Sequence, residues 1–218
     1  MNTQKAHRGI RWILVPAIVG LSLTLSACAP LLIGGAAASA MVANDRRTSG
    51  TFVEDASIEL KLTNKISAAL GERARVSVTS FNRRVLLTGE VATPTLKTMA
   101  AELAKNSPNV ELVVNELVVA AKASATQLAA DTLLSSRVKF ALVSDNGIDA
   151  SATKVITERG QVYLMGMLTE AEAQKVTEVV RRVSGVQGVV RVVEIISEQQ
   201  LLEFQRAAQQ RKAQQQAQ

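Results

Sequence analysis

An internal repeat is the feature that most constrains how this chain of 218 residues can fold. Residues 85–91 (VLLTGEV) recur as residues 162–168 (VYLMGML), an offset of 77 positions. A nearly equal offset relates two triplets of apolar residues further upstream: Ile58, Leu62 and Ile66 in the first copy, and Leu134, Val138 and Leu142 in the second. Such self-similarity predicts two similar units, near residues 54–120 and 130–197, rather than one large core.

The hydrophobic pattern of the first unit changes in a fixed order along the chain. Apolar residues three or four positions apart predict a first helix that ends near Gly71. Alternation from Val76 predicts two strands with a turn at residues 82–84, and Thr93-Pro94 is typical of the start of a second helix. We expect a third strand over residues 110–119 and the same order of elements in the second unit.

This order, helix–strand–strand–helix–strand, resembles the BON domain when it is taken together with three short motifs. The motifs are residues 85–89 (VLLTG), 109–115 (NVELVVN) and 185–189 (GVQGV). The resemblance implies an α+β fold with two small tandem domains, in each of which a three-stranded mixed sheet packs on two helices. The second unit departs from the family pattern at Arg191, where Asn is usual.

Gly89 and Gly166 occupy equivalent positions near the end of the second predicted strand of each unit. A residue without a Cβ avoids a clash where a buried strand turns into a helix, so we assign both glycines a structural role. Neither glycine belongs to a G-x-G-x-x-G or P-loop spacing, and the pattern therefore does not favour a phosphate-binding loop.

The N-terminus has the layout of an export signal that ends at Cys28, the only cysteine in the sequence. Three basic residues precede the apolar residues 12–25, and the run Leu-Ser-Ala-Cys at 25–28 resembles the lipobox of bacterial lipoproteins. This resemblance implies removal of residues 1–27 and acylation of Cys28 with an S-diacylglycerol group and an N-acyl chain such as palmitate. Ala29, rather than Asp, after the cysteine implies delivery to the outer membrane, facing the periplasm.

Two other interpretations of the N-terminus stay open. Residues 12–43 carry no charge and are long enough to span a bilayer, although prolines and glycines interrupt them. The small residues at 38–40 also have the pattern of an ordinary secretory cleavage site. In the lipoprotein interpretation, residues 28–53 are the acylated N-terminus and a flexible linker, residues 121–129 are a second linker, and residues 198–218 are a Gln-rich, partly disordered tail.

The composition of the mature chain argues against catalysis and nucleic-acid binding. The only histidine, His7, lies within the predicted signal, and acylation would block Cys28, so neither an imidazole nor a free thiol would remain. Loss of the signal also reduces the basic excess to 22 Lys and Arg against 19 Asp and Glu, with no dense basic stripe. We therefore expect a binding module that is not an enzyme and holds neither a metal nor a cofactor, apart from the acyl groups on Cys28.

The two copies differ on the outer face of the first predicted helix. The first unit has polar residues there, and the second has two large apolar residues around an arginine: Ser57, Lys61 and Asn64 against Leu133, Arg137 and Phe140, with Lys139 nearby. The spacing i, i+4, i+7 places three residues on one side of a helix, and an apolar stripe with basic residues suits an anionic membrane surface. The alternative is that Leu133 and Phe140 pack between the two domains.

The resemblance to lipoproteins with two BON domains supports the lipid interpretation. It implies that the first helix of the second domain binds anionic phospholipid, such as cardiolipin or phosphatidylglycerol. The family has an aromatic residue where this chain has Leu133, which predicts weaker anchoring at that position. The predicted function is that of an outer-membrane lipoprotein that supports envelope integrity, and the alternative is a periplasmic adaptor for the proteins of an outer-membrane assembly machine.

Overall fold

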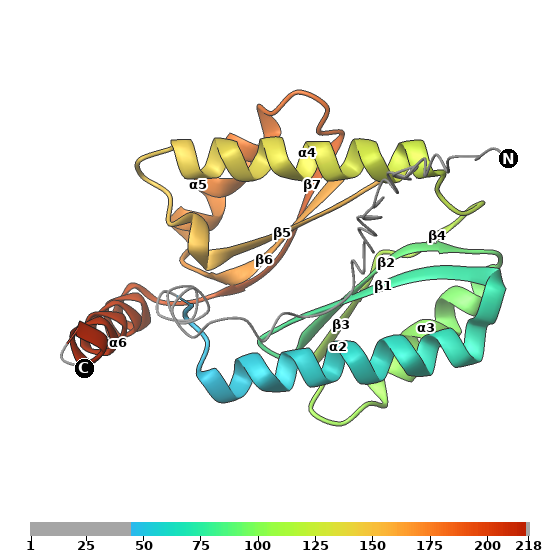
Figure 1. Ribbon diagram of the computed structural model, residues 1–218, viewed down its shortest axis with the longest axis horizontal. Coiled ribbons are helices and arrows are strands. Elements are labelled where there is room, and N and C mark those ends of the chain that lie inside the picture. The colour runs from blue at the N-terminus through green and yellow to red at the C-terminus, as the bar shows by residue number, and fades with distance from the viewer. Residues whose placement is uncertain (1–44, 217–218) are drawn as a thin grey trace, which may run out of the picture. The chain divides into compact units, whose positions relative to one another are not determined.

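The structure is a computed structural model that describes residues 45–216 of the chain (Figure 1). The predicted signal, Cys28 and most of the predicted linker 28–53 lie outside the described residues. The described part contains two domains with the same order of elements, followed by a C-terminal helix.

The first domain has the predicted order of elements, with its third strand in two pieces. The elements are α2 (Ser49–Leu70), the short 3-10 helix η1 (Gly71–Arg73), β1 (Ala74–Phe81), β2 (Arg84–Val91), α3 (Pro94–Lys105), β3 (Leu112–Asn115) and β4 (Val118–Val119). β1 pairs antiparallel with β2, whereas β3 and β4 both pair in parallel with β2. The result is the mixed sheet that the BON resemblance implied.

The third strand was predicted to be continuous over residues 110–119, and this is wrong in detail. Pairing is broken between Asn115 and Val118. The Asn115 side chain accounts for the break, because it accepts a hydrogen bond from the Leu117 N–H at 3.3 Å and donates one to the Lys97 carbonyl at 2.9 Å. Leu117 is fully buried in the core of the first domain as a consequence.

The second domain repeats the order with an uninterrupted third strand. Its elements are α4 (Ala125–Ser144), the short 3-10 helix η2 (Ala150–Ala152), β5 (Thr153–Glu158), β6 (Gln161–Leu168), α5 (Glu170–Arg181) and β7 (Gly188–Ile195). β5 pairs antiparallel with β6, and β6 pairs in parallel with β7. The predicted α+β class, with two helices on one face of each small mixed sheet, is confirmed (Figure 1).

The first helix of each domain forms around a stripe of aliphatic residues at helical spacing. The buried members are Ile58, Leu62, Ile66 and Leu70 in α2, and Leu134, Val138 and Leu142 in α4. Each such side chain contributes about 1.5–3 kcal/mol when it is fully buried. Hydroxyl caps fix the helix starts, since the Thr48 side chain accepts from the Thr51 N–H and Ser124 accepts from the Gln127 N–H.

Gly89 and Gly166 lie inside β2 and β6, two residues before each strand ends, and not at the strand-to-helix turn where the sequence analysis placed them. A Cβ at Gly89 would collide with the Arg75 carbonyl oxygen of the neighbouring strand, and one at Gly166 would collide with the Ala152 carbonyl oxygen. Gly89 also has a φ of +113°, which L side chains rarely adopt. The steric reason is therefore close approach between adjacent chain segments.

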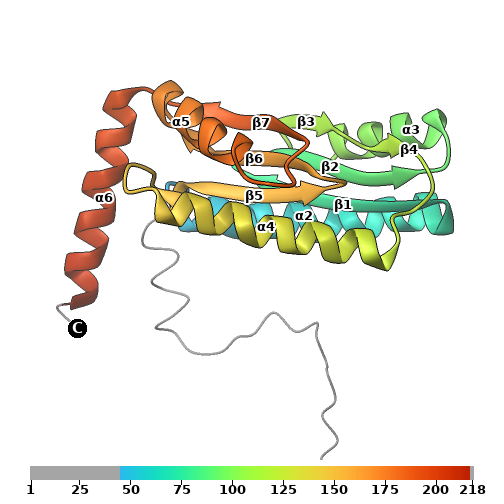
Figure 2. The ribbon, with the colours of Figure 1, turned by 90° about the horizontal axis from the view of Figure 1, so that it is seen from above.

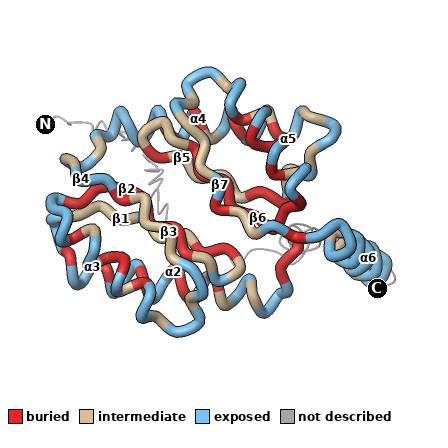
Figure 3. The backbone as a smooth tube through the Cα atoms, turned by 180° about the vertical axis from the view of Figure 1, so that it is seen from behind, coloured by how far each residue is buried: buried red, intermediate tan, exposed pale blue. Residues whose placement is uncertain are grey.

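The faces of the two sheets that carry no helices meet in a shared apolar cluster. Its buried members come from both domains: Phe81 and Leu86 from the first, and Tyr163, Met165, Met167, Val192 and Ile196 from the second. In β2, Val85 and Leu87 point into the first domain's own core while Leu86 points into the shared cluster. The repeated apolar runs of the sequence are thus strands buried on both faces (Figure 3).

A buried charge network adjoins this cluster and joins the two domains. Arg75 donates to Glu90 at 2.8 Å and also to Glu158 of the second domain, while Arg159 of the second domain donates to Glu90 at 3.3 Å. Burial by itself would raise the pKa of Glu90, but hydrogen bonds from Arg75, from the backbone of Ala123 and from Arg159 lower it below its ordinary value. Glu90 therefore stays ionised although it is fully buried.

Two predicted linkers are shorter than the sequence suggested. Residues 45–48 contact both domains and α2 begins at Ser49, so the described part of the predicted linker 28–53 is not a flexible linker. α4 begins within the predicted linker 121–129, because Ser124 and Gln127 form a reciprocal capping box at its start.

The predicted partly disordered tail, residues 198–218, is helical over its described length. α6 (Glu198–Gln216) follows Ser197, which exchanges hydrogen bonds with Gln200 in the manner of a capping box. Leu201 and Phe204 pack against the shared apolar cluster, so the first turns of α6 are held by the folded body (Figure 2).

Candidate functional site

The outer face of α4 carries the residues that the sequence selected as a lipid-binding surface. Asp131, Leu134, Val138 and Leu142 turn toward the core of the second domain. On the opposite face, Leu133 is 59% exposed and Phe140 is 74% exposed. Arg137 and Lys139 are exposed as well. The structure therefore brings Leu133, Arg137 and Phe140 together on one solvent-facing side, with Lys139 at its flank.

The alternative interpretation, that Leu133 and Phe140 pack between the domains, is wrong. Both side chains are exposed in the described part of the chain, and the domains meet instead through β-strand residues such as Leu86 and Met165. Neither residue belongs to a buried cluster. The exposed apolar face of α4 is thus available to something outside the folded body.

Val143, which sequence reasoning missed, extends this surface. It is 70% exposed and lies one turn beyond Phe140. Its spacing of ten residues from Leu133, close to three helical turns, was the signal that could have found it. We call Leu133, Arg137, Phe140 and Val143 the α4 patch.

Arg182 is a basic residue that the sequence analysis, which selected Arg137 and Lys139, did not select. It is exposed at the end of α5, and it contributes to lowering the pKa of Asp145 just after α4, behind the backbone N–H of Gly147 and the Lys175 side chain. The Arg137 guanidinium lies beside Gly185, three residues after Arg182. The end of α5 therefore adds a positive charge near the α4 patch.

An aspartate in the first helix of each domain holds the hairpin turn beneath it. Asp131 accepts hydrogen bonds from the N–H groups of Arg159 at 2.8 Å and Gly160 at 2.9 Å. Both turn residues have positive φ, and the carboxylate pairs with the donors that this tight turn exposes. Asp131 thereby fixes α4, and with it the α4 patch, against the sheet.

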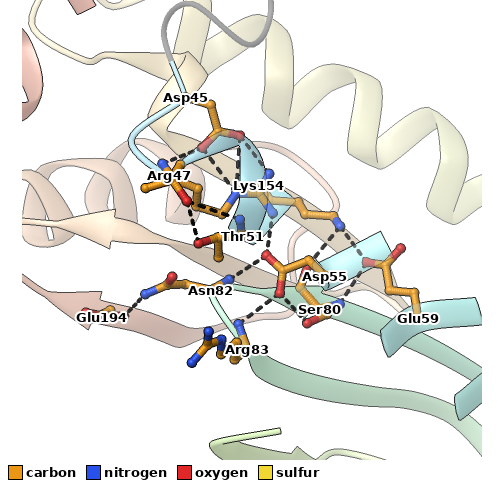
Figure 4. A network of polar contacts seen from close by, with 11 residues as sticks. Asp45, Arg47, Thr51, Asp55, Glu59, Ser80, Asn82, Arg83, Lys154 and Glu194 are labelled. Carbon is orange, nitrogen blue, oxygen red and sulfur yellow. Dashed lines mark hydrogen bonds and ion pairs between the residues drawn. The ribbon is translucent and has the colours of Figure 1, made fainter. Parts of the chain in front are cut away.

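Asp55 does the same in the first domain and binds two further groups (Figure 4). It accepts hydrogen bonds from the N–H groups of Asn82 and Arg83, both at 2.8 Å, and from the Ser80 hydroxyl at 2.6 Å. Arg47 completes the set with a bond of 2.8 Å. Burial would raise the pKa of Asp55, but these hydrogen bonds lower it below its ordinary value.

Within residues 45–216, no three His, Cys, Asp or Glu side chains gather in a way that could hold a metal ion. None of the helices in the described part of the chain is both long and apolar enough to cross a membrane.

Comparison with known proteins adds the decisive observation. Residues 54–121 and residues 130–197 each match the BON domain. The chain belongs to the BON-domain family. The two matched stretches are those that the repeat and its motifs selected, and they contain α2 to β4, from residue 54 on, and α4 to β7, from residue 130 on.

The relatives of this BON-domain chain include one outer-membrane lipoprotein. It is 37% identical over 177 residues to the Outer membrane lipoprotein DolP of Haemophilus influenzae, an alignment that covers 80% of this chain and 92% of DolP. It is 34% identical over 154 residues to the 21 kDa hemolysin of Actinobacillus pleuropneumoniae, covering 70% and 79% of the two chains. It is 29% identical over 148 residues to the Osmotically-inducible protein Y of Escherichia coli, covering 64% and 72%.

The similarity to DolP confirms the predicted resemblance to outer-membrane lipoproteins with two BON domains and the predicted localisation. Cys28 lies outside the described residues, so its acylation stays a prediction. The α4 patch belongs to BON domain 2, and Asp55 with its hydrogen-bonded hairpin turn belongs to BON domain 1.

Proposed function

We propose that this outer-membrane lipoprotein binds anionic phospholipid through the α4 patch of BON domain 2 and thereby supports the integrity of the envelope. The observation that carries the proposal is the exposure of Leu133, Phe140 and Val143 on a rigid helix, around the exposed Arg137. Acylation of Cys28 supplies the anchor, and no metal or other cofactor is involved.

The composition of the patch fits the interfacial region of a bilayer. Apolar side chains gain about 25 cal/mol for each Å² of apolar surface removed from water, so a half-inserted Phe140 and Leu133 together supply a few kcal/mol. A basic residue near an anionic surface adds about 1 kcal/mol, which favours anionic over neutral lipid. Arg137 lies one turn from both Leu133 and Phe140, so apolar insertion and charge attraction act at the same place.

The first helix of BON domain 1 shows why exposure of apolar residues is not sufficient. α2 also exposes large apolar side chains, namely Phe52 at 44%, Val53 at 67% and Leu60 at 64%. The neighbours of Leu60 at i−3 and i+4 are Ser57 and Asn64, whereas Phe140 has Arg137 and Ser144 at those positions. At the spacing i, i+4, i+7, α2 therefore has Ser57 between Val53 and Leu60, where α4 has Arg137 between Leu133 and Phe140, and its Phe52 ring and Lys61 lie outside this line.

The acyl anchor and the α4 patch, a stable and a weak contact with one membrane, reinforce each other. One acyl chain gives only marginal membrane attachment, and a multiply acylated cysteine gives stable attachment. Once the anchor is inserted, binding of the α4 patch becomes intramolecular, so a patch of low intrinsic affinity is still occupied.

Cosedimentation of the unacylated Cys28→Ser chain with vesicles tests the proposal. We expect binding to vesicles that contain cardiolipin or phosphatidylglycerol, weak binding to phosphatidylcholine vesicles, and at least a tenfold loss of binding for Leu133→Glu/Phe140→Glu. The matched control is Val53→Glu/Leu60→Glu, which places the same charges on the equivalent helix of BON domain 1. Equal losses in both double variants would reject the α4 patch.

The same variants also test the alternative function, that of a periplasmic adaptor. If the chain serves an outer-membrane assembly machine, affinity capture from envelopes should retain its protein partners in the Leu133→Glu/Phe140→Glu variant. Retained partners together with unchanged envelope integrity would favour the adaptor over the phospholipid function.

A further inference from the structure

Two consecutive arginines just before α2 reach different domains. Arg46 donates to the Met167 carbonyl at 2.6 Å and forms a bidentate pair with Glu172 of BON domain 2, at 2.7 and 2.8 Å. Arg47 instead binds Asp55 of BON domain 1 at 2.8 Å, and its guanidinium lies 4.1 Å from the centre of the Phe81 ring. The chain thus enters the folded body at the junction of the two domains.

These contacts are more buried than ordinary surface ion pairs. The side chains of Arg46 and Arg47 are only 6% and 7% exposed. Glu172 also accepts a hydrogen bond from the Thr169 N–H at 2.9 Å and so caps α5. Since bidentate arginine–carboxylate pairs with little solvent exposure hold a defined geometry, Arg46 is fixed relative to BON domain 2.

The same segment contacts the loop that follows the C-terminal end of α4. The Arg46 guanidinium is 3.8 Å from the Asp149 carboxylate, in the loop that follows α4. The segment also contacts α6, because Arg211 donates a hydrogen bond to the carbonyl of Asp45, the residue before Arg46, at 3.3 Å. Within the α4 patch, Phe140 and Val143 lie in the last turns before this loop, whereas Leu133 lies about two turns earlier.

We propose that Arg46 and Arg47 form a clamp that fixes where the acylated N-terminal segment joins the folded body, so that the C-terminal end of α4 faces the membrane that holds the anchor. The proposal rests on the proposed function, because it requires the anchor at Cys28 and a lipid-binding α4. Both arginines are positioning residues and do not themselves bind lipid.

The clamp shortens the stretch of chain between the anchor at Cys28 and the folded body. Between Cys28 and Asp45 the chain can extend no further than about 60 Å, against about 100 Å if the body began at the core residue Ile58. A shorter connection that ends beside one end of α4 raises the effective concentration of that end at the membrane. Phe140 and Val143 should therefore meet lipid more often than the start of α4.

A single environment-sensitive fluorophore can measure this orientation. Acylation blocks Cys28, the only cysteine in the sequence, so an introduced cysteine is labelled uniquely. We place it at the exposed outer positions Ser144→Cys or Ala129→Cys, at the two ends of α4. In the acylated chain inserted into phosphatidylglycerol vesicles, quenching by a lipid-borne quencher should be at least twofold greater at position 144 than at position 129.

Two variants open the clamp from opposite sides. Arg46→Ala removes the guanidinium, and Glu172→Gln removes its partner's charge while keeping an oxygen that can cap α5. Each should bring the quenching ratio of positions 144 and 129 close to one. Arg191→Ala is the matched control, because it breaks an exposed pair with Glu170 in the first turn of the same helix and should leave the ratio unchanged.

The outcomes separate the clamp from the proposed function. If the unacylated Cys28→Ser chain fails to bind anionic vesicles, the proposed function fails. If that chain binds, but the ratio in the acylated chain is already close to one or is unaltered in both clamp variants, the clamp is refuted and the lipid site stands.

Discussion

The aspartates that hold the hairpin turns, Asp55 in BON domain 1 and Asp131 in BON domain 2, perform the same task in different surroundings. Both accept two turn N–H groups. Asp55 also binds the Ser80 hydroxyl and Arg47, whereas the residue equivalent to Ser80 is Thr157, whose hydroxyl has no partner within the described residues. BON domain 1 thus binds Arg47 of the N-terminal segment through its hairpin aspartate, whereas the hairpin aspartate of BON domain 2 binds only the two N–H groups of its turn.

Replacement of Asp55 and of Asp131 by Ala should give the largest and most unequal losses in the free energy of unfolding. Asp55→Ala leaves Arg47 buried beside fewer acceptors and should lower the free energy of unfolding by about 3–5 kcal/mol. Asp131→Ala leaves only two turn N–H groups unpaired and should cost about 1–3 kcal/mol. Urea unfolding followed by circular dichroism measures both, with Glu170→Ala as an exposed control. A larger loss for Asp131→Ala would overturn the comparison.

Glu90 tests whether the two domains behave as one body. Glu90→Ala breaks the network that contains Arg75 and Arg159 and should lower the free energy of unfolding by about 2 kcal/mol. Tyr163, the only tyrosine, reports on the shared cluster, where burial, followed by the charges of Glu116 and Glu158, raises its pKa to about 12. Spectroscopic titration should show this pKa falling toward 10 in Glu90→Ala. An unchanged value would mean that the apolar cluster alone joins the sheets.

Acid should remove the stabilising contributions of Asp55 and Glu90, with a sign that follows from the pKa values of these two carboxylates. The folded-state pKa of Asp55 and that of Glu90 both lie below the ordinary values of 3.8 and 4.5. Their contributions to stability are therefore complete above those ordinary values and are lost as pH falls through the lower folded-state values. We expect the free energy of unfolding to fall between about pH 5 and pH 3, and to fall less steeply in Asp55→Asn. A parallel decline in the variant would show that other groups dominate.

The sequence predicted the local architecture well, because the information lies in short-range periodicity. The spacing of Ile58, Leu62 and Ile66 is enough to define the buried side of α2, and Leu133 and Phe140 stand out once the copies are aligned. That the central strands are buried on both faces was not predicted from the sequence, because the second face is covered by the sheet of the other domain.

The contacts between distant segments could not be predicted in the same way. Arg46 and Glu172 are 126 positions apart, and nothing in the local pattern of either residue distinguishes a buried pair from two exposed charges. The polar residues Asp55 and Asp131 were equally inconspicuous, although their equivalent positions in the two copies were a usable signal. Residues 45–48 are held by such long-range contacts, which is why the predicted linker was too long.

The smallest expected effect concerns Arg182, which extends the basic surface beyond α4. Arg182→Gln in the Cys28→Ser chain should weaken binding to phosphatidylglycerol vesicles by about fivefold, since one basic residue near the surface is worth about 1 kcal/mol. It should change the free energy of unfolding by less than about 0.5 kcal/mol because the side chain is exposed. Lys105→Gln, an exposed residue at the end of α3, is the matched control in BON domain 1. If both variants weaken binding equally, the attraction is one of net charge, and BON domain 2 holds no special position toward the membrane.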